Sequence, residues 1–293
     1  MPIAILGPTA SGKSAVAVAV ARRLGGTVVN GDPYQAIQGL AVGTGQPSEA
    51  EQRGIPHLGY AVLPLTARPN PIAFGSLVRG WLAACRDPVL VTGSGLYLRG
   101  IWDQLTNLPE VNSVLVDKVR RWTARLGVPV LHRYLAAVDP ARAGVLHPND
   151  SARVQRALSL HLATGRVPST LLSGPETGLP KDWRVLVVMP SREHRRERVA
   201  ARVSAQVQAG WPDEVARLLA AGHAEDLAAL RPLGYASWMT GEAPEVAQAK
   251  VIQETQAYAK RQATWFRNQL PGAPTWDPDV EPLETAFERL GLG

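Results

Sequence analysis

The segment that most constrains the fold is the glycine-rich octapeptide GPTASGKS, from Gly7 to Ser14. It follows the apolar run from Pro2 to Leu6, which is typical of a buried parallel strand, and it leads into an alanine- and valine-rich segment from Lys13 to Arg23, which is typical of a helix. A G-x-x-x-x-G-K-[ST] pattern between a strand and a helix is that of a P-loop. We therefore expect a phosphate-binding α/β protein.

The residue types of this loop fit the binding of a phosphate. Glycines let the backbone wrap around the anion, and the helix N-terminus adds N–H donors and a partial positive charge. Lys13 can neutralise phosphate oxygens, and the Ser14 hydroxyl can hold Mg²⁺, the expected cofactor. The alternative is a glycine-rich turn without a ligand. The predicted diphosphate or nucleotide site consists of Gly7, Pro8, Thr9, Ala10, Ser11, Gly12, Lys13 and Ser14.

The strand signal recurs in three further segments, namely Thr27 to Asn30, Pro88 to Thr92 and Arg184 to Met189. Helical patterns cover Ile72 to Ala84, Ser191 to Gln208, Pro212 to Ala221 and Pro244 to Leu270. This order predicts an α/β fold with a P-loop NTPase-like parallel sheet flanked by helices, in which ligands collect at the carboxyl ends of the strands. Gly7, Asp32 and Ser94 follow three such ends, so we expect their loops to converge on one crevice.

The middle of the chain lacks a strand signal. Helical patterns are found at Val111 to Leu126, Pro129 to Val138 and Ser151 to Thr164, and a loop is expected at residues 173–178. We predict an all-helical insertion domain at residues 105–180, set into a catalytic core made of residues 1–104 and 181–293.

The amino-acid composition limits the cellular compartments and the classes of binding partner that this chain could have. No segment of the 293 residues approaches the roughly 20 apolar residues of a membrane span, and the first apolar run leaves no room for a signal peptide. The single cysteine, Cys85, which we expect inside a helix, excludes an internal disulfide and is typical of a reducing compartment. We therefore predict a cytoplasmic protein without membrane association. The net charge of +6 favours a polyanionic partner.

A carboxylate near the loop is the next candidate. A P-loop protein that hydrolyses ATP usually offers an aspartate at the end of a second apolar strand, to hold Mg²⁺. The strand from Pro88 to Thr92 ends in Thr-Gly-Ser instead. Asp32 lies close to the P-loop along the chain and has the chemistry to ligate the metal or to accept a proton. The alternative is a turn or helix-capping aspartate.

Three segments suit an RNA partner. The motif HPND at 147–150 precedes Arg153 and Arg156, a basic pair at helical spacing. The helix predicted to begin at Ser191 carries a ridge of arginines. The segment YAKRQATWFR at 258–267 mixes cations with aromatic side chains, a composition suited to phosphates and unstacked bases. For each cluster the alternative is a solvated helix face.

In this order the motifs resemble the tRNA dimethylallyltransferase family, also called the tRNA isopentenylpyrophosphate transferases. The resemblance covers nearly the whole chain, and the ordered set is specific, whereas a P-loop alone is shared by a very large superfamily. After the P-loop, the matching motifs are DPYQ at 32–35, VGTG at 42–45, GSGLY at 93–97, HPND at 147–150, SRE at 191–193, LGY at 233–235 and AKRQATWFR at 259–267.

The resemblance implies that the loop binds the diphosphate of dimethylallyl diphosphate. The five-carbon prenyl group would move to N6 of adenine 37 in tRNA, and diphosphate would be released. Asp32 would be the general base that takes the proton from the attacking amine. Diphosphate and Mg²⁺ would be held by Thr9, Lys13 and Ser14, with Arg198 or Arg202 assisting the leaving group and Asp32 as a further candidate ligand of Mg²⁺.

The resemblance also implies which residues contact RNA. Ser94 and Tyr97 would line the channel that admits the flipped adenine, and the helical insertion would grip the anticodon stem. Since one catalytic unit that grips a large RNA needs no partner subunit, we expect a monomer. The remaining residues predicted to contact tRNA are Asp32, Pro33, Tyr34, Gln35, Arg153, Arg156, Gly234, Tyr235, Lys260, Arg261 and Arg267.

The chain departs from the family pattern at several places, two of which are Pro33 and Gln46. Pro33 replaces the serine of the usual Asp-Ser-x-Gln motif and removes a hydroxyl and a backbone donor. Gln46 lies where a lysine is common. Two other functions stay open at this point: a nucleotide-dependent small-molecule kinase, for which the P-loop and sheet would look the same, and a tRNA-binding relative without catalysis.

Overall fold

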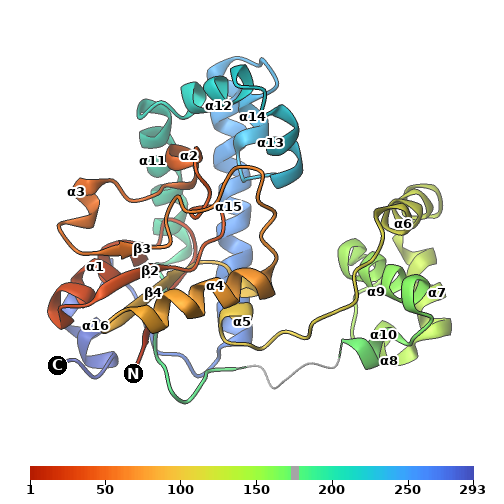
Figure 1. Cartoon of the computed structure of the whole chain (residues 1–293), viewed down its shortest axis with the longest axis horizontal. Coiled ribbons are helices and arrows are strands. Elements are labelled where there is room, and N and C mark those ends of the chain that lie inside the picture. Colours follow the sequence, from red (N-terminus) through yellow and green to blue (C-terminus); the bar gives the residue numbers. More distant parts are fainter. Residues whose placement is uncertain (173–177) are drawn as a thin grey trace. The chain divides into compact units, whose positions relative to one another are not determined.

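The computed structural model describes residues 1–172 and 178–293. The chain divides into two compact units, one formed by residues 1–103 and 177–293 and the other by residues 104–176. Figure 1 shows the elements of both units. Each unit has a hydrophobic core of its own. The loop expected at residues 173–178 lies outside the described residues, apart from Gly178.

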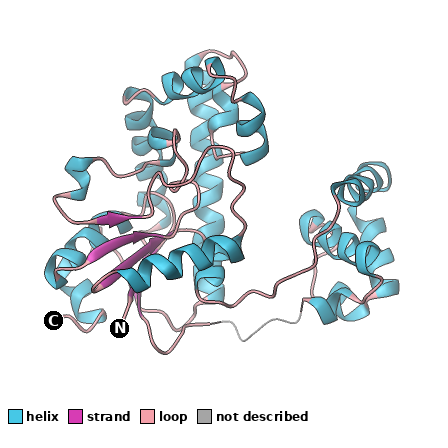
Figure 2. Ribbon diagram, in the orientation of Figure 1, coloured by secondary structure: helices cyan, strands magenta, loops and turns pink. Residues whose placement is uncertain are grey.

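The larger unit is built on a sheet in which all neighbouring strands are parallel (Figure 2). In the described residues its order is β3-β2-β4-β1-β5-β6. The four strands expected from apolar runs are confirmed to within one residue, whereas β3 and β6 were not expected because two residues carry no periodic signal. The bounds are β1 Ile3–Leu6, β2 Thr27–Asn30, β3 His57–Leu58, β4 Pro88–Thr92, β5 Arg184–Val188 and β6 Thr275–Trp276.

Helices cover both faces of the sheet. On one face, Ile5 and Val91 pack against α1 (Lys13–Leu24) and α16 (Leu283–Arg289). On the other face, Leu6 and Leu90 pack against α4 (Pro71–Ala84), α5 (Gly95–Ile101) and the end of α15 (Pro244–Gln269). Because both faces are buried, the strand sequences are continuous apolar runs. The predicted parallel sheet flanked by helices is confirmed.

A third core is formed by the helices after β5 together with Ile37 and Leu40 from the segment after β2. Trp211 and Tyr235 lie fully buried at its centre. Figure 1 shows α11 and α15 side by side, and two side-chain hydrogen bonds join them, Gln248 to Ser204 and Gln256 to the carbonyl of Arg196. The helices are α11 (Arg192–Gln208), α12 (Trp211–Ala220), α13 (Ala224–Leu230), α14 (Tyr235–Trp238) and α15; two short helices, α2 (Ala41–Thr44) and α3 (Glu49–Gln52), follow β2.

The first and last residues of several helices are determined by the capping residues next to them. Ser191, expected as the first residue of α11, is its N-cap, and its hydroxyl accepts the N–H of His194 at 3.2 Å. Helix α4 ends at Ala84, so Cys85 is not inside a helix, contrary to expectation; it is the half-buried capping residue in extended conformation. Among the described residues, no helix is both long and apolar enough to cross a membrane.

The smaller unit contains helices and no strand in its described residues, which agrees with the helical patterns of the sequence. Its core is formed by side chains such as Leu135, Val154 and Leu158. The helix expected from Val111 begins two residues later because the Asn112 side chain caps it. The bounds are α6 Ser113–Leu126, α7 Val128–Val138, α8 Pro140–Gly144, α9 Ser151–Thr164 and α10 Pro168–Leu171.

Candidate active site

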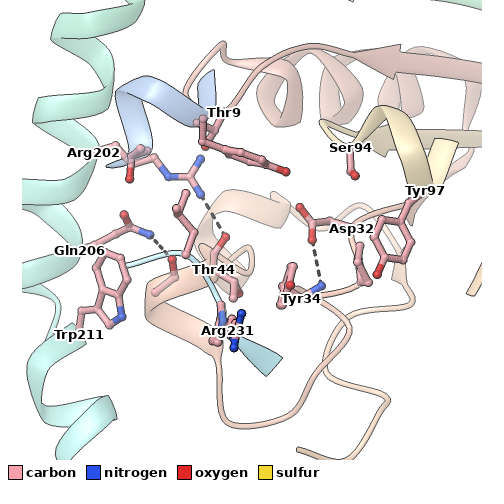
Figure 3. A pocket seen from close by; sticks show the side chains of 16 residues that line it. Thr9, Asp32, Tyr34, Thr44, Ser94, Tyr97, Arg202, Gln206, Trp211 and Arg231 are labelled. Atoms are coloured by element: carbon pink, nitrogen blue, oxygen red, sulfur yellow. Dashed lines mark hydrogen bonds between the residues drawn. The ribbon is translucent and has the colours of Figure 1, made fainter. Parts of the chain in front are cut away.

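Three loops that follow neighbouring strands meet at a cavity of about 350 Å³ (Figure 3). The P-loop follows β1, Asp32 follows β2, and Ser94 follows β4, and these strands adjoin one another in the sheet. Thr9, Asp32 and Ser94 line the cavity together, so the predicted convergence is confirmed. We call this space the Asp32 cavity. Its walls also include Pro33, Tyr34, Tyr97, Tyr258, Trp211, Gln206, Arg202 and Arg231.

A second space, the P-loop cavity, has a volume of about 590 Å³. Gly12, Lys13 and Ser14 line it from the P-loop. Gly12 has a φ of 90°, a conformation that favours glycine, and α1 begins at the next residue. Arg202 and Gln206, both on α11, line this cavity and the Asp32 cavity, so they lie where the two spaces adjoin.

Lys13 has an unusual electrostatic setting. Its ammonium donates to the carbonyl of Pro8 at 3.4 Å. Burial lowers the pKa of Lys13 to about 8, Arg202 acts in the same direction, and Asp32 acts in the opposite direction. At neutral pH the side chain is therefore a weakly solvated cation, which binds an anion more strongly than a surface lysine does.

Asp32 is both a turn residue and a wall of its cavity. Its Oδ1 accepts the N–H of Tyr34 at 3.0 Å, and its own N–H donates to the side chain of Asn30 at 2.8 Å. Burial raises the pKa of Asp32, although the N–H of Tyr34, Lys13, the N–H of Gln35 and Arg202 all act to lower it. A carboxylate that is held in place and is more basic than usual suits proton abstraction.

Gln262 connects two of the converging loops. Its Oε1 accepts the N–H of Thr9 at 2.8 Å, and its Nε2 donates to the carbonyl of Gly93 at 2.8 Å. The side chain is buried, at 8% exposed. Helix α15 therefore fixes the P-loop relative to the loop after β4, from a position 253 residues along the chain from Thr9.

Arg198 and Arg202, the two α11 arginines expected to assist the leaving group, differ in their surroundings. Arg202 donates to the carbonyl of Thr44 at 3.2 Å and reaches both cavities. Arg198 lines only the P-loop cavity, where it donates to the carbonyl of Ser11 at 3.4 Å and forms an ion pair with Asp279. Of the pair, Arg202 is the one placed to act at the boundary between the cavities.

Four residues expected to contact RNA lie with Asp32 on one cavity wall: Pro33, Tyr34, Ser94 and Tyr97. The Tyr34 hydroxyl donates to the carbonyl of Leu230 at 3.1 Å, and that of Tyr97 donates to the carbonyl of Pro69 at 2.8 Å. Burial raises the pKa of Tyr97 to about 12, so its hydroxyl remains protonated at neutral pH. The structure thus places these four residues around one cavity, and their contact with RNA stays a prediction.

Tyr235 is too buried to contact RNA, contrary to expectation, whereas Gln35 is half-buried and its contact with RNA stays a prediction. Tyr235 is 1% exposed, and its hydroxyl donates to the buried carboxylate of Glu214 at 2.7 Å. The Gln35 amide donates to the carbonyls of Thr44 and Gly45, at 3.0 and 2.8 Å. Both side chains hold neighbouring parts of the chain. Gly234 packs against the Trp211 ring, where it leaves no room for a side chain.

The departure at Gln46 also has a structural role. Its amide donates to the carbonyls of Gln35 and Ile37, at 3.0 and 2.8 Å. The side chain lines the P-loop cavity but is held by the main chain. A neutral amide therefore replaces, at this wall, the cation common in the family.

The basic residues expected to contact RNA are exposed and lie on two units. Lys260, Arg261 and Arg267 are on α15, outside the Asp32 cavity. Arg153 and Arg156 are on α9 in the smaller unit, where Arg153 pairs with Asp150 at 2.7 Å. Lys260 also borders a groove between α11 and α15 that is lined by Arg192, Arg195, Arg196, Gln253 and Gln256.

Several residues that line the Asp32 cavity or hold its loops were not predicted from the sequence. Tyr258 and Gln262 lie in the quoted C-terminal motif, which contained the signal although no role was assigned to them. Gln206, Trp211 and Arg231 belong to segments that carry no recognisable motif. An amide, an indole and a guanidinium acquire their place here only because the helices after β5 pack over the sheet end.

A P-loop with a half-buried lysine is suited to a phosphorylated ligand, and the adjoining cavity, lined by aromatic side chains and a carboxylate of raised pKa, is suited to a second, flat reactant. The fold and site thus define a P-loop group-transfer enzyme. The model of the IPP transferase family matches residues 35–269, and the model of isopentenyl transferases matches residues 2–58. The chain belongs to the IPP transferase family.

Individual relatives align with this chain over nearly the full length of both proteins. The tRNA dimethylallyltransferase of Rhodospirillum centenum is 38% identical, over 94% of this chain and 92% of its own. That of Halorhodospira halophila is 37% identical, over 99% of this chain and 98% of its own. The crystal structure of the tRNA isopentenylpyrophosphate transferase from Bacillus halodurans has a TM-score of 0.70 and 28% identity, and covers 99% of this chain and 94% of that one.

Proposed function

We propose that this protein transfers a dimethylallyl group from dimethylallyl diphosphate to N6 of adenine 37 in tRNA and releases diphosphate. Relatives that align with almost the whole chain are tRNA dimethylallyltransferases. The observation that carries the proposal is the place of Arg202 between two cavities, one lined by the P-loop and the other by a basic aspartate among aromatic side chains.

The P-loop side would hold the leaving group. Displacement at the allylic carbon develops negative charge on diphosphate, and Lys13 and Arg202 are weakly solvated cations next to that position. Mg²⁺ fits here through the exposed hydroxyl of Ser14. Since no group of three or more His, Cys, Asp or Glu gathers in the described residues, its other ligands would be substrate oxygens and water. The ion would supply further neutralisation of the diphosphate charge.

Asp32 would act as the general base. The N6 amine of adenine attacks the first carbon of the prenyl group, the carbon–oxygen bond to diphosphate breaks, and the N6 proton passes to the Asp32 carboxylate. Because an aromatic amine is a weak nucleophile, a carboxylate with a raised pKa assists as the new bond forms. Asp32 lines a different cavity from Ser14, which favours the role of base over that of metal ligand.

The aromatic cavity would receive the base of a flipped nucleotide. Tyr34, Tyr97 and Tyr258 provide flat surfaces for stacking. Extrusion of a base costs a few kcal/mol and least for an unpaired loop base. Exposed cations on α15 and α9 would hold RNA phosphates, and the protein would act in the cytoplasm as a monomer.

The test uses labelled dimethylallyl diphosphate, Mg²⁺ and unmodified tRNA with adenines at positions 36 to 38. Wild type and the matched control Asp182→Asn, an exposed aspartate, are expected to fix label on the RNA at the same rate, whereas Asp32→Asn is expected to fix it far more slowly. If no label is fixed while ATP is consumed with a small acceptor, the protein is a kinase. Binding of tRNA without either activity would show a non-catalytic relative.

A further inference from the structure

The carboxylate of Glu214, on α12, is buried beside the Asp32 cavity at 5% exposed. It accepts hydrogen bonds from the N–H groups of Val42 and Gly43, at 2.7 and 3.1 Å, and from the Tyr235 hydroxyl at 2.7 Å. Burial of a carboxylate is strongly unfavourable unless hydrogen-bond donors surround it. Glu214 therefore holds the first turn of α2 by its free N–H groups.

Gln206 holds the same two residues from the other side. Its amide donates to the carbonyl of Val42 at 2.7 Å and to that of Gly43 at 3.1 Å. A side chain at Gly43 would overlap the indole nitrogen of Trp211 and the hydroxyl of Tyr235. The main chain at this point is thus fixed by charge, by hydrogen bonds and by close packing.

Thr44, the residue after Gly43, is in contact with Arg202 and fixes its orientation. The carbonyl of Thr44 accepts a hydrogen bond from the Arg202 guanidinium at 3.2 Å (Figure 3) and another from Gln35. Gly45 packs directly on the same guanidinium. A displacement of α2 would therefore move the group that lies between the two cavities.

We propose that Glu214 is a positioning residue of the transfer reaction, which acts through the main chain of Val42 to Thr44 to orient Arg202, with Tyr235 as its support. The inference rests on the proposed function, in which Arg202 stabilises the leaving diphosphate. Charge stabilisation depends on groups that are already oriented before the reaction, and a misplacement of about 1 Å costs up to about a hundredfold in rate.

A double-mutant cycle on kcat tests this, with RNA and dimethylallyl diphosphate saturating. Glu214→Gln places an NH₂ group against N–H donors and is expected to lower kcat about tenfold or more in the wild-type background. In the Arg202→Ala background the same change is expected to alter kcat by less than about twofold, because the group it orients is gone. Tyr235→Phe removes one hydroxyl and is expected to follow the same pattern with a smaller loss.

Val215→Ala is the matched control, because Val215 is the next residue on α12 and is 1% exposed. It is expected to lower Tm but to leave kcat unchanged in both backgrounds. Equal losses of kcat for Glu214→Gln in both backgrounds, or a change in Tm alone, would overturn the inference and leave the role of Arg202 intact. Wild-type turnover by Arg202→Ala would overturn the assignment of Arg202 itself. If Glu214→Gln does not fold, Tyr235→Phe decides.

Discussion

The side-chain oxygen of Gln262 accepts the main-chain N–H of Thr9 at 2.8 Å, and the same amide donates to Gly93. This buried amide is the connection between the P-loop and the loop after β4. Because the two loops line one cavity, the geometry of the site depends on a residue near the end of the chain.

Gln262→Ala leaves the N–H of Thr9 and the carbonyl of Gly93 unpaired in a buried place. We expect a loss of about 1–3 kcal/mol in the free energy of unfolding and a raised KM for dimethylallyl diphosphate. Denaturant unfolding and steady-state kinetics measure the two effects. Asn268→Ala, at an exposed position of the same helix, is the control and is expected to change neither. Wild-type stability of Gln262→Ala would refute the connection.

The transfer rate should depend on the protonation of Asp32. Burial raises its pKa above the ordinary 3.8, and only the ionised carboxylate can take the N6 proton. The single-turnover rate is therefore expected to fall as the pH drops through this raised value, by up to about tenfold per pH unit. Rapid-quench measurements at saturating substrates test this. Asp32→Asn should retain only a slow rate without this acid limb, and a flat wild-type profile down to about pH 4 in folded protein would contradict the assignment.

The lowered pKa of Lys13 leads to a second prediction of pH dependence, that substrate binding weakens as the pH rises. Since its pKa is lowered to about 8, the ammonium loses its charge as the pH rises through that value, and its attraction for diphosphate is lost. The Kd of dimethylallyl diphosphate should rise above about pH 8, and calorimetry should show proton uptake on binding there. In Lys13→Arg, which stays protonated, this rise in Kd should vanish, even if binding is weaker. A Kd that is constant from about pH 7 to about pH 10 would exclude this role.

The groove between α11 and α15 should contribute to RNA affinity. Arg195 is buried in it at 5% exposed, and burial with Arg267 and Arg192 nearby lowers the pKa of Arg195, which indicates repulsion that an anion would relieve. The double variant Arg196→Gln, Lys260→Gln should weaken tRNA binding. The slope of log Kd against log salt should fall by about 1 for each RNA phosphate that the variant no longer neutralises.

The control for the groove is Arg86→Gln, whose side chain is 92% exposed and lies outside this groove. Titrations of fluorescent tRNA at several salt concentrations compare the variants. If the groove variant and the control have the same slope, the groove takes no part in binding. If wild type does not bind tRNA, the proposed function itself fails.

The parts of the fold that could be predicted from the sequence are those defined by residues close together along the chain. The strand, P-loop and helix from Ile3 to Leu24 are contiguous, so apolar runs and glycine spacing define them without knowledge of the rest. Asp32 and Ser94 could be assigned to the same crevice because they end strands of one parallel sheet. Edge strands of two residues, such as β3, carry no pattern of their own and form only beside an existing neighbour.

The sequence by itself determined the phosphate-binding loop, the parallel sheet and the place of the basic aspartate, because each follows from hydrophobic periodicity and from chemistry within a few residues. Only the tertiary structure decided that Gln35 and Tyr235 support the main chain, that Gln262 holds the P-loop, and that Glu214 reaches Val42 across 172 residues. A polar side chain gains such a role through burial and through the donors that long-range packing brings to it, and neither is encoded in its neighbours along the chain.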